Sequence, residues 1–152
     1  MAQVFILDPH YLGPGLSVTV ERRVHGEVIV DLREMAQVYK AKDTFLTQVG
    51  VELTKEEWQV LDASEPLVKH RIGLYVRFKN GDIPEPQNPP IYLSEDAFVS
   101  IESDEGGNVR ILKTMPDDTI QTVSMWPNNW RTLTHRLPEI TQLVKDLALK
   151  TE

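Results

Sequence analysis

The sequence predicts an α+β fold in which a four-stranded antiparallel unit ending in a helix occurs twice. The first observation behind this prediction is an internal alignment. Residues 17–30 match residues 98–111 at a constant offset of 81, so the alternating apolar positions coincide and Gly26 falls on Gly107. Alternating strands resemble one another by themselves, but a shared glycine within the alternation indicates a related hairpin.

A second alignment continues the first one further along the chain. Residues 51–61 match residues 123–133 at an offset of 72, which brings Trp58 onto Trp130, and a proline follows each tryptophan at the same distance. The offset falls by nine, which corresponds to a single length difference in the connection after Arg33. Glycine, tryptophan and proline recurring at coherent spacing therefore predict a duplicated unit.

The first unit is predicted to contain a meander of strands and one helix. Apolar residues recur with a period near two, the pattern of half-buried strands, in residues 4–7, 16–24, 28–34 and 45–53. Thr54 then stands at a helix N-cap, with Glu57 placed three residues later to complete a capping box.

The second unit repeats this order of elements. Its expected strands are residues 74–79, 98–103, 108–114 and 119–125. Residues 106–108 (Gly-Gly-Asn) supply the positive-φ positions of a tight hairpin, and Pro127 stands where a helix begins. Pro66 and Pro138 occupy matching places and are expected to kink or restart the two helices.

The predicted domain organisation is two units, residues 1–72 and 73–152, in one chain. Residues 81–91 hold four of the ten prolines and are expected to form an extended spacer, with a proline-rich ligand for another domain as the alternative. A four-stranded sheet with one helix leaves one face or edge uncovered. We therefore expect the two curved sheets and their C-terminal helices to pack as an intramolecular pseudo-dimer around a shared core.

The composition argues against an enzyme. The 152 residues include no cysteine, the four histidines are scattered, and no motif points to catalytic residues, a metal or a cofactor. No apolar run approaches the length of a membrane span, and residues 1–11 lack the basic start of a secretory signal. We therefore expect an intracellular protein, nuclear if the source is eukaryotic or viral. The net charge of -7 disfavours indiscriminate coating of nucleic acid.

Two motifs of the first unit carry a family resemblance. Residues 26–34 (GEVIVDLRE) are followed after fifteen residues by 50–58 (GVELTKEEW). This arrangement resembles the positive cofactor four family of transcriptional coactivators, which shows a strand ending in I-D-I-R-E and a G-I-S-L-x-x-E-x-W segment that opens a helix. Two such units in tandem are also similar to the Pur and Whirly proteins. The resemblance implies a curved antiparallel sheet whose face binds single-stranded DNA or RNA.

Candidate contact residues for a single strand are basic and aromatic side chains, because cations follow the phosphates and rings stack on bases. In the first unit they are Arg22, Arg23, Arg33, Tyr39, Lys40, Lys42, Phe45 and Trp58. In the second unit they are Arg77, Lys79, Arg110, Lys113, Trp126 and Trp130. Core packing is the alternative role for Trp58 and Trp130, and an ordinary solvated strand face is the alternative for the arginines of the first unit.

The leading functional hypothesis is a single-stranded nucleic-acid-binding protein that acts as a transcriptional coactivator or regulator, or in DNA maintenance. Its expected partners are single-stranded DNA or RNA and the transcription machinery, and its expected state is a monomer with an internal pseudo-twofold or a homodimer. The rival hypothesis is an acidic protein-interaction scaffold that keeps the fold without binding nucleic acid. Two departures from the family favour this rival: residues 44–50 (TFLTQVG) carry no charged side chain where the family's loop is rich in lysine and arginine, and each half of the chain is acidic overall.

Overall fold

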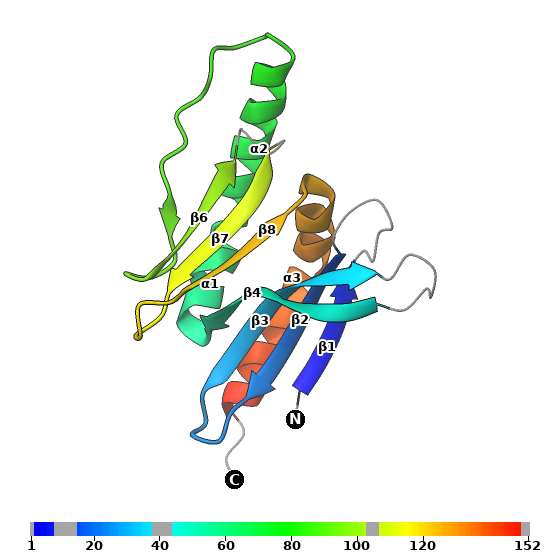
Figure 1. Cartoon of the computed structure of the whole chain (residues 1–152), viewed down its shortest axis with the longest axis vertical. Helices are drawn as coiled ribbons and strands as arrows, with labels where there is room; N and C mark the ends of the chain where they lie inside the picture. The colour runs from blue at the N-terminus through cyan, green and yellow to red at the C-terminus, as the bar shows by residue number, and fades with distance from the viewer. Residues whose placement is uncertain (1, 8–14, 38–43, 103–106, 150–152) are drawn as a thin grey trace.

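The computed structural model describes residues 2–7, 15–37, 44–102 and 107–149, and side chains within residues 15–34, 49–102 and 107–149. Across these residues the protein is α+β with two antiparallel sheets (Figure 1). The strands of one sheet are β1 (Ala2–Leu7), β2 (Gly15–Arg22), β3 (Val28–Gln37) and β4 (Thr44–Thr54), in that order. The strands of the other are β5 (Ile91–Tyr92), β6 (Ala97–Glu102), β7 (Asn108–Thr114) and β8 (Ile120–Met125).

Three helices complete the described fold: α1 (Lys55–Ala63), α2 (Glu65–Lys79) and the C-terminal α3 (Pro127–Leu149). The predicted capping box starts α1, with the Thr54 hydroxyl accepting from the Glu57 N–H and the Glu57 carboxylate accepting from the Thr54 N–H. A helix also begins at Pro127, as predicted, because proline suits a first turn, where no intrahelical partner is needed for its nitrogen.

The two internal prolines have different effects. The first helix is interrupted as expected: α1 ends at Ala63 and α2 begins at Glu65, with Pro66 in its first turn. By contrast, α3 runs without a break through Pro138. Of the predicted kink or restart at Pro138, the restart does not occur.

The predicted strand over residues 74–79 is also wrong, because these residues form the last part of α2. The apparent alternation of Leu74, Val76 and Phe78 competes with a helical spacing in which Val68 and Tyr75 are buried and Ile72 packs against the core. The first strand of the second sheet is instead β5, beyond the proline-rich connection. The expected boundary between residues 72 and 73 lies inside α2.

One continuous core joins both sheets and the helices. The inward-facing positions of β2, β3 and β4 are Leu16, Val18, Val20, Val28, Val30, Leu32, Val51 and Leu53. Their counterparts in the second sheet are Ala97, Val99, Ile101, Val109, Ile111, Val123 and Met125. Helix α3, from the second half of the chain, contacts β1, β2 and β3 of the first sheet and also β7 and β8 of the second, whereas α2 contacts β6 (Figure 1).

The two sheets meet where β4 approaches β8. The Gln121 side-chain oxygen accepts from the Glu52 backbone N–H at 2.9 Å. Gly50, from the second family-like motif, lies where β3 and β4 come closest: a Cβ there would lie 2.8 Å from the Leu32 carbonyl oxygen. The register shift of β3 between Arg33 and Met35 follows directly beside it. This glycine is therefore required by backbone approach rather than by a turn.

Candidate nucleic-acid interface

The outward face of the β5–β8 sheet carries an aromatic pair, one ring exposed and the other half-buried. In β6 the buried residues alternate with outward ones, which places Phe98 on the outer face. Tyr92 of β5 lies opposite Phe98 in the register, with 5.9 Å between ring centroids and 60° between ring planes. Tyr92 is 63% exposed, so its ring face is accessible from solvent.

A guanidinium lies on the same face, one row further along the strands. Arg110 of β7 pairs with Ser100 and Ser124, whereas Phe98 belongs to the neighbouring row, about 7 Å away along β6. The Arg110 Nε donates to the Thr122 hydroxyl at 3.1 Å, and its Nη1 lies 3.6 Å from a Glu102 carboxylate oxygen. This long, half-exposed ion pair leaves guanidinium N–H groups facing solvent.

The outward face of the β1–β4 sheet differs in that its described arginines are paired with carboxylates at shorter distances. The Arg23 guanidinium lies 3.0 Å from Glu21 of β2 and 3.0 Å from Glu52 of β4, and so spans β3. The hydrogen bond with Glu52 is the largest contribution that raises the pKa of Arg23. Arg33 pairs with Asp31 at 3.2 Å on the same face.

Asp31 occupies a poorly compensated position on that face. Burial raises its pKa, and the hydrogen bond from Arg33 only partly offsets this effect. Among the described residues, its Oδ1 has no hydrogen-bond partner. Three carboxylates therefore face two guanidinium groups, and this surface offers little net positive charge to a phosphate backbone.

Several predicted contact residues lie away from both outward faces. Trp58 and Trp130 are buried in the core, at 0% and 3% exposure, so the core-packing alternative is the one observed. Lys113 points inward and its Nζ lies 2.7 Å from the Glu57 carboxylate. Arg22 stands on the inward side at the end of β2, where its guanidinium approaches the Gly26 turn.

The remaining predicted residues are either exposed outside the strands or lie outside the described residues. Arg77 and Lys79 are exposed on α2 rather than on a strand, and the Lys79 ammonium lies 5.7 Å from the Tyr75 ring centroid. Trp126 is 39% exposed between β8 and α3. The placement of Tyr39, Lys40 and Lys42, and the side chain of Phe45, lie outside the described residues.

Of the predicted residues whose side chains the structure describes, only Arg110 therefore shares a sheet face with Tyr92 and Phe98. Sequence reasoning missed Tyr92 and Phe98, although the alternation in residues 97–102 could have placed Phe98 outward. Tyr92 carried no such signal, because β5 is only two residues long and follows an irregular, proline-rich segment.

Over the described ranges, no group of three or more acidic or histidine side chains could hold a metal ion. Within the same ranges, no helix is long and apolar enough to cross a membrane. No protein-family model matches the chain, and no curated protein matches it.

Proposed function

We propose that this protein binds single-stranded nucleic acid on the outward face of the β5–β8 sheet. The observation that carries the proposal is the Tyr92–Phe98 pair, in which the Tyr92 ring is exposed and the Phe98 ring half-buried, with Arg110 in the adjoining row. Rings on such a platform stack on bases, and a guanidinium can pair with phosphate or lie over a base. By its family resemblance, the protein would act in transcriptional regulation or DNA maintenance.

The charge distribution sets the expected strength of this binding. With 16 basic against 23 acidic side chains, the long-range field repels a polyanion. Stacking must then supply much of the affinity, and the few phosphate contacts predict a shallow dependence on salt. We therefore propose modest affinity rather than tight, salt-driven association.

We also propose that the fold is a duplicated unit arranged about a pseudo-twofold axis. Gly26 and Gly107 both adopt positive φ in the hairpins β2–β3 and β6–β7. Trp58 and Trp130 are each the fourth residue of a helix, and both are buried. The packing of α3, from the second half of the chain, on β1, β2 and β3 of the first half is what two intertwined copies would produce.

The binding proposal is tested by titrating labelled DNA and RNA oligonucleotides of about 20 nucleotides, longer than the roughly 4–16 that one comparable site covers. Fluorescence anisotropy is measured at low and at moderate salt. Tyr92→Ala should weaken binding about 5- to 150-fold, because one stacked base contributes roughly 1–3 kcal/mol.

Ile120→Ala is the matched control. Ile120 is the first residue of β8, lies on the same outward face and is 62% exposed, but it has no ring to stack on a base. Equal effects of the two variants, or absence of micromolar binding at low salt, would contradict the proposal.

The second candidate function is an acidic protein-interaction scaffold. The ion pairs of Arg23 and Arg33 with carboxylates on the β1–β4 sheet favour it, because they neutralise the cations that a nucleic-acid face would use. This function predicts no oligonucleotide binding, together with self-association in light scattering or a stable partner in a pull-down.

A further inference from the structure

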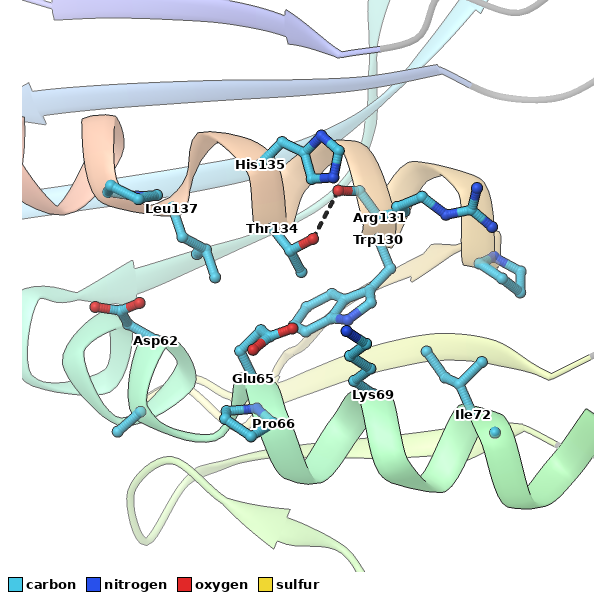
Figure 2. A pocket seen from close by; sticks show the side chains of 14 residues that line it. Asp62, Glu65, Pro66, Lys69, Ile72, Trp130, Arg131, Thr134, His135 and Leu137 are labelled. Atoms are coloured by element: carbon cyan, nitrogen blue, oxygen red, sulfur yellow. Dashed lines mark hydrogen bonds between the residues drawn. The ribbon is translucent and has the colours of Figure 1, made fainter.

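A groove separates the α1–α2 junction from the first half of α3, on the helical side of the molecule. Its volume is about 890 Å³. Figure 2 shows Glu65 and Lys69 lining it from the side of α2, and Trp130 projecting towards them from α3. The groove belongs to neither outward sheet face and is independent of the proposed nucleic-acid surface.

The Trp130 side chain leaves a donor unused in this groove. The residue is only 3% exposed, yet its Nε1 has no hydrogen-bond acceptor among the described residues. A buried donor without a partner costs about 1–3 kcal/mol. Such groups are rare in native proteins, and a bound water or ion that accepts the hydrogen bond is one of the recognised explanations.

The equivalent indole at the other end of the core has its acceptor. The Trp58 Nε1 donates to the Thr141 hydroxyl at 3.1 Å, and that hydroxyl donates to an Asp62 carboxylate oxygen at 3.1 Å. Thr141 stands three residues after Pro138, and the residue three after Pro66 is Lys69. A lysine ammonium has only donors, so it cannot replace the threonine as acceptor.

The side chains around Trp130 favour an anion at this point. Lys69 and Arg131 line the groove, and neither forms an ion pair with another described residue. The carboxylates of Asp62 and Glu65 lie at the α1–α2 junction, and Asp62 already accepts from Thr141.

The rest of the lining suits an apolar group. Pro66, Ile72, Leu137 and Pro138 contribute hydrocarbon surface to the walls. A groove of this volume that combines apolar walls with convergent polar groups is typical of small-molecule sites.

We propose that this groove binds a small organic anion, with a carboxylate or phosphate oxygen accepting from the Trp130 indole N–H beside the Lys69 ammonium. The apolar body of the ligand would pack against the proline, isoleucine and leucine side chains. The carboxylates at the junction disfavour a second negative charge at that end, so the ligand should carry its charge at one end only.

The experiment follows the indole N–H signals in two-dimensional ¹⁵N–¹H NMR spectra of the full chain. The sequence has three tryptophans, so three such signals are expected and can be assigned with Trp→Phe variants. Phenylacetate and phenyl phosphate, each titrated through the millimolar range, are the two probes. Either should move the Trp130 signal, while Trp58, which is hydrogen-bonded to Thr141, serves as the internal reference.

Two variants of one residue separate the ligand effect from general structural change. Lys69→Met keeps the side-chain length but removes the charge, and should weaken binding about tenfold. Lys69→Thr supplies a hydroxyl acceptor like that of Thr141, and should shift the free Trp130 signal and abolish its response to either probe.

The responses to the two probes identify the chemical group that the groove binds. A response to one probe identifies carboxylate or phosphate as the group bound, and a response to both identifies a general anion site. No movement of the Trp130 signal with either probe, equal movement of Trp58, or unchanged binding by Lys69→Met would overturn the proposal.

Discussion

The starts of α1 and α3 solve the same capping problem with different side chains. Glu57 and Asn129 are each the third residue of a helix, and both are buried. Each side chain accepts from the backbone N–H of the residue before its helix, Thr54 at 2.9 Å and Trp126 at 3.3 Å. The position therefore needs an acceptor that reaches backwards, and either a carboxylate or an amide supplies it.

The difference between the two ends lies in the charge. The Glu57 carboxylate is held by the Lys113 ammonium at 2.7 Å and by the Ser94 hydroxyl at 2.6 Å. Asn129 is neutral and needs no such partner, and the offset of 81 places the buried Leu32 where the second sheet has Lys113. A buried acid and the lysine that neutralises it therefore form a unit, and both residues must be gained or lost together.

The largest expected effect comes from breaking this unit. Lys113→Leu should lower the free energy of unfolding by about 3–5 kcal/mol, because it leaves a buried carboxylate without its counter-charge. The double variant Glu57→Asn/Lys113→Leu, which copies the residues of the other end, should recover most of that loss. Urea denaturation of the four proteins in the cycle measures the coupling, and simple additivity of the two changes would refute the paired role.

The two hairpin glycines share a backbone conformation but differ in the space available for a side chain. Gly26 and Gly107 both have positive φ, so alanine at either position costs about 1–3 kcal/mol in strain. At Gly107 a Cβ would also lie 2.6 Å from the Tyr75 ring, whereas at Gly26 its nearest neighbour is the Arg22 guanidinium at 3.6 Å. Gly107→Ala should therefore be the more destabilising by a further 1–3 kcal/mol or so. Thermal unfolding of both variants provides the test. Equal losses of stability would show that the Tyr75 ring of α2 can move away from the added methyl group at little cost.

The smallest expected effect is the pH dependence of the buried acid. Burial alone would raise the pKa of Glu57, but hydrogen bonds from Lys113, Ser94 and the Thr54 N–H outweigh it and lower the pKa. The unfolded chain therefore binds the proton more readily. The stability that Glu57 contributes is present above the unfolded value of about 4.3 and is lost as the pH falls through the folded value.

Asp31 makes the opposite contribution, because its pKa is raised and acidification relieves the cost of its charge. Asp31→Asn should therefore make the acid loss of stability steeper, and Glu57→Asn/Lys113→Leu should make it shallower. Urea midpoints measured from neutral pH to below about 4 compare the two. A shallower profile for Asp31→Asn would contradict the assigned direction.

Much of the local structure could be predicted because its causes are local. The capping box of Thr54 and Glu57, the helix start at Pro127 and the positive φ of Gly107 each depend on a few neighbouring residues. Period-two alternation also placed the strands of both sheets except β5, and it wrongly predicted a strand over residues 74–79. Residues 74–79 fit both a short alternating pattern and a helical spacing. They form the end of α2, which packs against β6.

The candidate site was harder to predict because its parts come from distant segments. Arg110 was identified because it is a basic residue in a predicted strand. The rings of Tyr92 and Phe98 come together only because β5 pairs with β6. Lys113 was expected to face solvent, but it pairs with Glu57 across 56 positions of the chain. The alternation in β7 indicates that Lys113 shares the face of Ile111, but it does not reveal the buried acid.

The sequence by itself therefore determined the class of fold, most strands, the helix caps and the apolar face of each element. These features follow from periodicity and from contacts between near neighbours in the chain. Only the tertiary structure decided how the helices lie on the two sheets, why Lys113 is buried, and that the Trp130 indole N–H has no acceptor among the described residues. Each of these depends on partners that are remote in sequence, and periodicity gives the direction of a side chain but not the group that it meets.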